Sequence, residues 1–287
     1  MPELPEIEII KRSLFKLINN AKINDILIKN KNLRYKIPKN FSRDLINQKI
    51  LKISRRSKYL VFHFKNKLLL IHLGMSGKLL ILRKKDKSLF KTSFYYGLNI
   101  IKKHNHVYFS LNNGLILIYN DVRKFGFFKL YNKKDKNKII FLNKLGVEPF
   151  SKFFNLKYFK KLLKNRKKNI KNILMDQTFV SGLGNIYVNE ALYLSKIHPL
   201  KLCNDLSTKE INFLIKNIKI ILKKSISRGG SSIKDFSNSY GESGKFQDCF
   251  KVYARDNMSC SRISCKGKIK KILISNRSSF YCNNCQT

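Results

Sequence analysis

The chain has 287 residues, of which 60 are Lys or Arg and 17 are Asp or Glu, so its formal charge at pH 7 is +43. Hydrophobic residues make up 43% and aromatic residues 12%, which excludes an intrinsically disordered chain. The positive charge indicates a polyanionic partner, first of all nucleic acid, although part of it reflects a composition rich in Lys, Ile and Asn. No run of about 18 apolar residues is present, and the acidic start is unlike a targeting peptide. We therefore expect a cytoplasmic protein with no membrane partner.

An amphipathic helix is predicted close to the N-terminus, directly after Pro5. Apolar residues recur there at helical spacing, at Ile7, Ile10, Leu14, Leu17 and Ile18. Pro2 and Glu3 lie just before this helix.

Short β-rich segments follow between about residues 22 and 132. They read KINDILIKN, KYLVFHF, KLLLIHL, KLLIL, HVYFSL, GLILIY and FGFFKLY. Asn113 and Gly114 separate two of them, which is a strong hairpin signal. This series predicts an antiparallel sandwich or barrel.

The pattern between about 133 and 225 is helical, in the segments KYFKKLLKN, NEALYLSKIHP and TKEINFLIKNIKIILKKSISR. The stretch around Pro149 is the expected linker between the β-rich and helical parts. Residues 229–248 are rich in Gly and Ser and predict a loop.

Four cysteines close the chain with the spacing C-x4-C-x16-C-x2-C: Cys260, Cys265, Cys282 and Cys285. Two close pairs of this kind are typical of a zinc site with four thiolate ligands, and the 16 intervening residues can form a β-ribbon. The alternative is two disulfides, which fits a cytosolic protein poorly. Cys203 and Cys249 lie apart and are expected to be ordinary thiols.

The N-terminus has the residue types that covalent catalysis requires. If Met1 is removed, Pro2 presents a secondary amine, and α-amino groups titrate at about pH 8, so a sizeable fraction is neutral and nucleophilic. Such an amine can condense with a sugar C1′ to give an iminium, while Glu3 and Glu6 donate and accept protons. The alternative for either acid alone is a favourable charge at a helix N-terminus.

Two loop sequences combine groups that could pry a base out of a duplex. One places Met75 between glycines in HLGMSG, and the other places Arg123 beside Phe125 in DVRKFG. An apolar wedge can fill the vacated stack while an arginine binds the orphaned base. Each loop taken alone is also compatible with ordinary packing.

Several motifs occur in a fixed order: MPELPEIE, RRSKYL, HLGMSGKL, KHNHV, DVRKFG, LMDQTFVSGLGNIYVNEAL and NRSSFYCNNCQ. In this combination the chain resembles bacterial formamidopyrimidine-DNA glycosylases along its whole length. The resemblance implies a bifunctional repair enzyme that excises 8-oxoguanine and formamidopyrimidines and then cuts the abasic strand by β,δ-elimination. It also implies an α+β multidomain fold: an antiparallel β-sandwich with its N-terminal helix at 1–133, a helix-two-turns-helix domain with a loop over the lesion at 134–248, and a zinc ribbon at 249–287.

The resemblance assigns a role to four catalytic residues. Pro2 is the expected nucleophile and forms the Schiff base, and Glu3 is the proton donor to the departing base. Lys58 in RRSKYL is the expected proton donor for β-elimination, and Arg277 in NRSSFYC serves δ-elimination.

The resemblance also places DNA contacts. His104, Arg123 and Lys167 are expected to contact DNA. Lys171 and Asn185 are expected to hold phosphates near the lesion. The residues expected to fill the gap left by the flipped nucleotide are Met75, Arg123 and Phe125.

Two departures from the family pattern concern the first cysteine pair, usually C-x2-C, and Val122, where proline is common. Neither removes a reacting group. The expected partner is damaged double-stranded DNA, with one zinc ion, no small-molecule cofactor and a monomeric state.

Two alternatives remain open. The first is an endonuclease VIII-like enzyme for oxidised pyrimidines, but that relative typically reads PEGPE where this chain has PELPE, which favours purines. The second is a non-catalytic DNA-binding protein. The presence of every expected reacting residue argues against it.

Overall fold

The computed structural model describes residues 2–86, 88, 102–231 and 246–287. It divides into two compact units, one formed by Met1–Asn143 with Ile226–Gln247 and the other by Lys144–Ser225 with Asp248–Thr287. Among the described residues, no helix has the length and apolar character needed to cross a bilayer.

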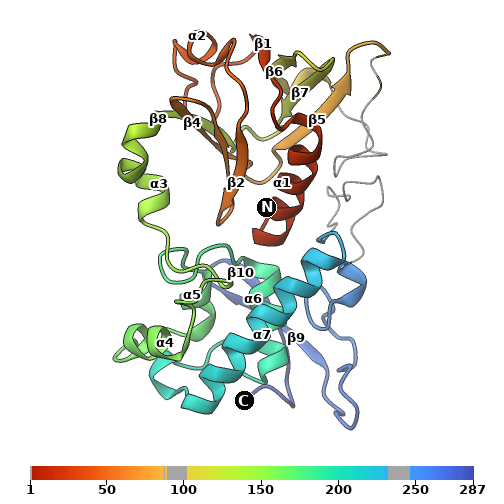
Figure 1. Cartoon of the computed structure of the whole chain (residues 1–287). Helices are drawn as coiled ribbons and strands as arrows, with labels where there is room; N and C mark the ends of the chain where they lie inside the picture. The colour runs from red at the N-terminus through yellow and green to blue at the C-terminus, as the bar shows by residue number, and fades with distance from the viewer. Residues whose placement is uncertain (1, 87, 89–101, 232–245) are drawn as a thin grey trace. The chain divides into compact units, whose positions relative to one another are not determined.

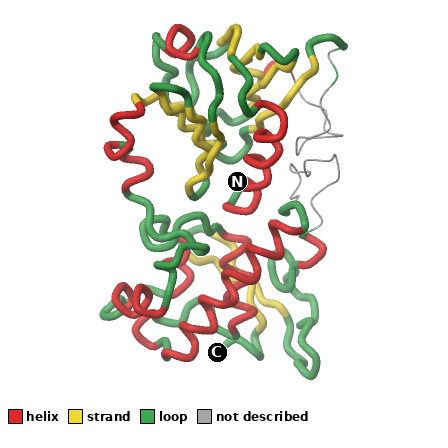
Figure 2. Tube along the Cα trace, viewed as in Figure 1, coloured by secondary structure: helices red, strands yellow, loops and turns green. Residues whose placement is uncertain are grey.

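The first unit is built from two four-stranded antiparallel sheets (Figures 1 and 2). One sheet has the order β1 (Ile23–Ile28), β6 (Asn105–Leu111), β7 (Leu115–Asn120) and β5 (Lys78–Arg83). The other has the order β2 (Lys52–Arg56), β3 (Tyr59–His63), β4 (Lys67–His72) and β8 (Phe127–Asn132). Aromatic side chains connect the sheets, because Phe109 and Tyr119 both pack edge-on against Phe128. The predicted sandwich is therefore confirmed.

The β6–β7 hairpin turns at the predicted position. Gly114 has a φ of +77°, a left-handed conformation that glycine adopts without strain. Ser110 then pairs with Ile116 across the two strands. Strand β2 was not predicted, because its sequence KISRR has almost no apolar residues and buries only Ile53 fully.

Helix α1 (Leu4–Ile18) follows the expected pattern. Its apolar face, which includes Ile7, Ile10, Leu14 and Ile18, joins the same buried core as both sheets. Glu3 is the N-cap, and the first turn forms a capping box in which the backbone N–H of Glu3 donates to Oε2 of Glu6 at 2.9 Å. The remaining short elements of this unit are α2 (Phe41–Leu45), η1 (Lys102–His104), η2 (Lys133–Lys138) and α3 (Ile140–Asn143).

The second unit is mainly helical. Its elements are α4 (Leu156–Leu163), α5 (Ile170–Met175), α6 (Asn185–Ser195), η3 (Cys203–Asp205), α7 (Thr208–Ser227, whose last residues fall in the first unit), η4 (Gln247–Cys249), β9 (Ile269–Ile274) and β10 (Arg277–Cys282). Helix α6 is buried on nearly all sides, as expected for a helix at the centre of a unit. Strands β9 and β10 form an antiparallel ribbon, as predicted from the spacing of the cysteines.

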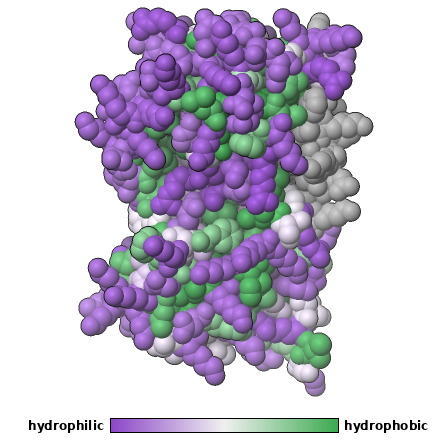
Figure 3. Space-filling model, in the orientation of Figure 1, coloured by the Kyte–Doolittle hydropathy of each residue, from purple (hydrophilic) through white to green (hydrophobic). Residues whose placement is uncertain are grey.

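Hydrophilic side chains cover most of the visible face of each unit (Figure 3). This agrees with the excess of Lys and Arg over Asp and Glu in the sequence. The lysine-rich helices thus present charge to solvent while their apolar faces form the cores.

Candidate functional site

The start of α1 gathers three of the predicted reactive residues. Pro2 and Glu3 are buried at the N-terminal end of the helix, and Glu6 is buried one turn later. A helix N-terminus carries a partial positive charge and favours carboxylates beside it. The fold therefore holds two acids next to the residue whose amine is the expected nucleophile.

Glu6 also holds the beginning of the glycine-rich segment. Its Oε1 accepts hydrogen bonds from the backbone N–H of Ser231 at 3.0 Å and from the Ser231 hydroxyl at 3.1 Å. A Cβ on Gly230, whose φ is +79°, would meet this same oxygen at 3.2 Å. The backbone N–H of Phe246 donates to the carbonyl of Gly230, so the two described ends of the segment meet. Most of the loop predicted over 229–248 lies outside the described residues.

Lys58 lies in the two-residue turn between β2 and β3, after Ser57, and its side chain is buried. Arg55 fixes this turn, because its Nη1 donates to the carbonyl of Ser57 at 2.9 Å and its Nε donates to Oε2 of Glu8 at 3.0 Å. Burial raises the pKa of Glu8, but hydrogen bonds from Lys11, Arg55 and Arg12 outweigh it, so that the pKa is lowered overall. Glu8 and Arg55 therefore form a charged pair between α1 and the hairpin that carries Lys58.

The two predicted wedge loops lie together on the surface of the first unit. Met75 and Phe125 are 43% and 42% exposed, so both large apolar side chains are open to a partner. The Arg123 guanidinium donates to Sδ of Met75 at 3.3 Å and lies 4.6 Å from the centre of the Phe125 ring. The structure thus brings together the three residues expected to fill a gap in DNA.

Asp121 organises these loops, a role that the sequence did not predict. Its carboxylate is fully buried and accepts from the hydroxyls of Ser76 and Tyr119 and from the backbone N–H of Arg123 and Gly126. Its backbone N–H donates to the carbonyl of His104 at 3.0 Å, which places the expected DNA-contacting histidine beside the same loops. Asp121 is thus an internal anchor for the surface that carries Met75, Arg123 and Phe125.

His72 supports the same region as a neutral side chain. Its burial, and after that the charges of Lys58 and Arg34, lower its pKa to about 4. The neutral ring accepts the backbone N–H of Gly74 at its Nδ1 and stacks on Phe127. A Cβ on Gly74 would meet the backbone of Phe125 at 2.5 Å, so only glycine lets the two loops approach this closely.

In the second unit, Lys171 and Asn185 converge on the start of strand β10. Lys171 is 1% exposed, and its Nζ donates to the carbonyl of Ser278 and to the Ser279 hydroxyl. Nδ2 of Asn185 donates to the same Ser278 carbonyl at 2.9 Å. Burial, followed by the charge of nearby Arg277, lowers the pKa of Lys171 to about 8. Three of the predicted residues therefore form one cluster.

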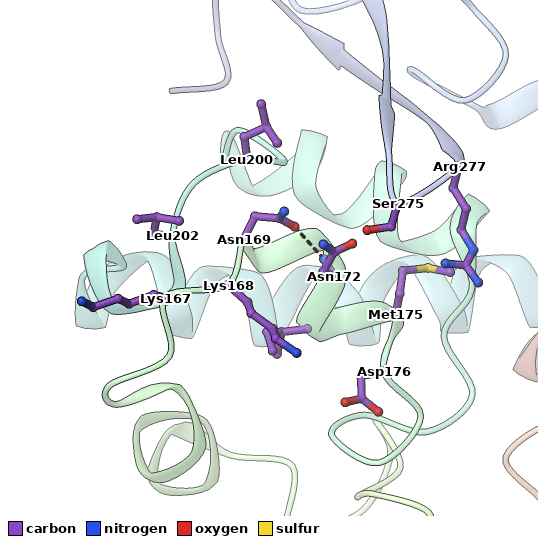
Figure 4. Close-up of a pocket in the computed structure, with 11 residues that line it drawn as sticks. Lys167, Lys168, Asn169, Asn172, Met175, Asp176, Leu200, Leu202, Ser275 and Arg277 are labelled. Carbon is purple, nitrogen blue, oxygen red and sulfur yellow. Dashed lines mark hydrogen bonds between the residues drawn. The ribbon is translucent and has the colours of Figure 1, made fainter.

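A pocket of about 700 Å³ opens beside this cluster (Figure 4). Its lining comprises Lys167, Lys168, Asn169, Asn172, Ile173, Met175, Asp176, Leu200, Leu202, Ser275 and Arg277. Lys167 and Arg277 lie at opposite ends of the residues drawn, and Asn169 caps α5 by accepting the backbone N–H of Asn172 at 2.9 Å. Three of the lining residues are cationic and one is acidic, so the pocket suits an anion.

The four C-terminal cysteines meet at one point. Their sulfur atoms all lie within 4.8 Å of one another, with Cys260 and Cys285 at 3.9 Å and Cys265 and Cys282 at 3.6 Å. Zinc–thiolate bonds of about 2.3 Å in a tetrahedron place sulfurs roughly 3.8 Å apart, so the donor set fits zinc. All six cysteines are free thiols, which rules against the disulfide alternative in this structure.

Comparisons with known proteins agree with these observations. Residues 1–128 match the formamidopyrimidine-DNA glycosylase N-terminal domain, and residues 145–237 match the formamidopyrimidine-DNA glycosylase H2TH domain. A formamidopyrimidine-DNA glycosylase of Rickettsia africae is 42% identical over all of this chain and 99% of its own length. This chain belongs to the formamidopyrimidine-DNA glycosylase family.

Other members of the family give the same result. The Bartonella tribocorum glycosylase is 41% identical, and the alignment covers the whole of both chains. Among solved structures, Lactococcus lactis Fpg in complex with abasic-site DNA has a TM-score of 0.87 at 36% identity over 99% of each chain. A variant of that protein bound to DNA containing Fapy-dG has a TM-score of 0.88 at 36% identity over both full chains. The resemblance found in the sequence motifs is thus confirmed for the family and the fold.

Proposed function

We propose that this protein is a DNA base-excision repair enzyme, a glycosylase that removes oxidised purines and an AP lyase that then cuts the strand. The observation that carries the proposal is the start of α1, where Pro2 lies buried with Glu3 and Glu6 in a member of this family. Relatives have been solved with damaged DNA, and the charge of +43 suits the same partner.

The proposed reaction begins when the Pro2 amine attacks C1′ of the extruded nucleotide. The C1′–N9 bond breaks, and Glu3 gives a proton to the departing purine. The sugar ring then opens as the Pro2 nitrogen loses its proton and O4′ gains one, which leaves an iminium between Pro2 and C1′. This cation acidifies the C2′ proton, so that the 3′ phosphate leaves first and the 5′ phosphate second.

Two further residues serve the eliminations by resemblance to the family. Lys58 supplies a proton in β-elimination, and its burial in a tight turn limits its movement. Arg277 serves δ-elimination. Because the iminium acts as the electron sink for both steps, one covalent link explains both activities.

DNA is proposed to bind through residues in both units. In the first unit, Met75, Arg123 and Phe125 fill the gap left by the extruded nucleotide, and His104 contacts DNA. In the second unit, Lys171 and Asn185 hold phosphates, and the neighbouring pocket with Lys167 accepts a further part of the backbone.

Cys260, Cys265, Cys282 and Cys285 are proposed to hold one zinc ion, which would supply a structural cross-link that fixes the ribbon. We further propose a cytoplasmic monomer whose domains span 1–133, 134–248 and 249–287, the last ending in this ribbon.

Borohydride trapping tests the enzymatic proposal. The native-terminus protein is mixed with a duplex containing 8-oxoguanine opposite cytosine, and reduction should give a covalent adduct. The adduct should disappear in Pro2→Gly and in protein with an uncleaved N-terminal tag. Absence of any adduct with the native terminus would refute the covalent mechanism.

Oxidised pyrimidines are the second candidate substrate class. One Lactococcus lactis Fpg structure contains DNA with an oxidised pyrimidine, at 36% identity to this chain. Cleavage of 8-oxoguanine opposite cytosine should be compared with cleavage of thymine glycol in the same sequence context. We expect faster cleavage of the purine lesion, and faster cleavage of thymine glycol would reverse the assignment.

A further inference from the structure

The segment between Cys260 and Cys265 contacts helix α6 through Arg262. Nη2 of Arg262 donates to the carbonyl of Tyr193 at 2.6 Å and to the carbonyl of Leu194 at 3.2 Å. These carbonyls belong to the last turn of α6, where a positive charge is favoured, and the carbonyl of Tyr193 also accepts a hydrogen bond from the backbone N–H of Lys196. The four-residue spacing, longer than the usual family spacing, thus brings a cation to the end of a buried helix.

Arg262 also covers the ring of Tyr193. The guanidinium carbon lies 4.7 Å from the ring centre, within the range of a cation–π contact. Tyr193 is 2% exposed and packs in one cluster with Cys260, Cys282, Val252 and Phe280. The ring is therefore held on one side by Arg262 and on the others by the core beneath the ribbon.

The hydroxyl of Tyr193 points to a cysteine sulfur. Its oxygen lies 3.3 Å from Sγ of Cys260 and 3.3 Å from the hydroxyl of Ser261. A cysteine that binds zinc is a thiolate, which can accept but not donate a hydrogen bond. With the metal bound, Tyr193 must therefore be the donor in its contact with Cys260.

We infer that Tyr193 and Arg262 are positioning residues for the metal site, in which Tyr193 donates a hydrogen bond to the Cys260 ligand and Arg262 fixes the tyrosine against the end of α6. The inference rests on the proposed zinc site. Four thiolates around Zn²⁺ carry a net charge of about −2, and a hydrogen bond to one of them together with a nearby guanidinium disperses that charge. The longer spacing thereby links metal retention to the central helix of the second unit.

Tyr193→Phe tests the hydrogen bond, because it removes only one oxygen and keeps the ring. Partners of this kind typically change metal affinity about 10-fold to 100-fold. We expect Tyr193→Phe to raise the zinc dissociation constant of the full-length protein by about 10-fold in competition with a chromogenic chelator. Arg262→Met, which keeps the length of the side chain but removes its charge and donors, should have a similar or larger effect.

Tyr158→Phe is the matched control. Its hydroxyl donates a hydrogen bond in the second unit, to the carbonyl of Phe179 at 2.6 Å. Tyr158→Phe should leave zinc affinity unchanged, while it lowers thermal stability about as much as Tyr193→Phe does. An equal loss of zinc affinity in both tyrosine variants would attribute the effect to general destabilisation and overturn the inference.

Cobalt substitution gives a second readout that does not depend on activity. In Co²⁺-loaded protein, the thiolate-to-cobalt charge-transfer band should shift in Tyr193→Phe and stay unchanged in Tyr158→Phe. An unshifted band together with unchanged zinc affinity would refute the role of Tyr193. Wild-type protein that binds neither metal would instead refute the proposed zinc site.

Discussion

The carboxylate of Glu8 and the guanidinium of Arg55 lie 3.0 Å apart and join helix α1 to the hairpin that presents Lys58. Both side chains are largely buried, at 12% and 9% exposure. Arg55 in turn donates to the carbonyl of Ser57, directly before Lys58. The helix that begins just after the proposed nucleophile and the turn that carries the proposed proton donor are thus joined by this ion pair.

Glu8→Gln should therefore destabilise the protein and slow β-elimination. Breaking a largely buried ion pair leaves one charge uncompensated and costs on the order of 3 kcal/mol. Chemical denaturation gives the stability loss, and cleavage of an abasic duplex in single-turnover experiments gives the elimination rate. Asp44→Asn is the control, because it removes the ion pair to Lys67 in the same unit, away from this hairpin. An elimination rate in Glu8→Gln equal to that of the control would contradict the positioning role.

The ion pairs of Glu8 with Lys11, Arg55 and Arg12 together predict a dependence of stability on pH. The folded-state pKa of Glu8 lies below its ordinary value of 4.5, so its stabilisation is fully present above that pH. It is lost as pH falls through the lowered folded-state value. The difference in unfolding free energy between wild type and Glu8→Gln should accordingly shrink in acid. A difference that does not change with pH would show that the ionised Glu8 carboxylate does not stabilise the fold.

Asp121→Asn should disorder the surface formed by Met75, Arg123 and Phe125. An amide presents a donor where Asp121 now accepts only, so that at least one buried donor loses its partner at a cost of about 1–3 kcal/mol. We expect weaker binding to a duplex with an abasic-site analogue, measured by fluorescence anisotropy. Unchanged affinity in a destabilised variant would show that the order of these loops does not limit binding.

Lys171 should make DNA affinity fall as pH rises. Its pKa of about 8 means that it is charged below this pH and neutral above it. If it holds a phosphate, binding should weaken between about pH 7 and pH 9, and Lys171→Met should flatten that profile and reduce the salt slope by about 0.9. Lys167→Met, at an exposed position of the neighbouring pocket, should keep the wild-type profile. Parallel profiles for Lys171→Met and wild type would contradict the assignment.

Cys282→Ser should lose both zinc and DNA binding. Cys282 is fully buried, its sulfur lies within 4.8 Å of the other three, and removing one of four ligands leaves an incomplete tetrahedron. Metal content by atomic absorption and affinity for a lesion duplex measure the two effects. Loss of zinc with unchanged DNA affinity would show that the ribbon is dispensable for binding.

Local sequence patterns were sufficient for the elements with clear periodicity. The hairpin at Gly114, the apolar face of α1 and the β-ribbon between the cysteines all follow from residue spacing. Strand β2 escaped prediction because KISRR is polar and pairs through its backbone. Helix α5 escaped because its six residues make less than two turns, about 3.6 residues each, which is too short for a periodic pattern.

The partners of the site residues were harder to predict than the residues themselves. Motifs identified Pro2, Glu3 and Lys58, but nothing in their spacing indicates Ser231, which binds Glu6 from 225 positions away. Asp121 begins the motif DVRKFG, but the motif does not indicate its role. Four donors reach the buried carboxylate only when separate loops fold together.

The closed base of the glycine-rich segment has a consequence for how the sequence of this segment could vary within the family. Gly230 and Phe246 meet through a backbone hydrogen bond, and Ser231 is tied to Glu6. The hydrogen bonds of Gly230, Ser231 and Phe246 therefore fix both ends of the segment. The sequence between them, residues 232–245, can be exchanged between relatives as one unit. Such an exchange would leave the hydrogen bonds between Ser231 and Glu6, and with them the first turn of α1, unchanged.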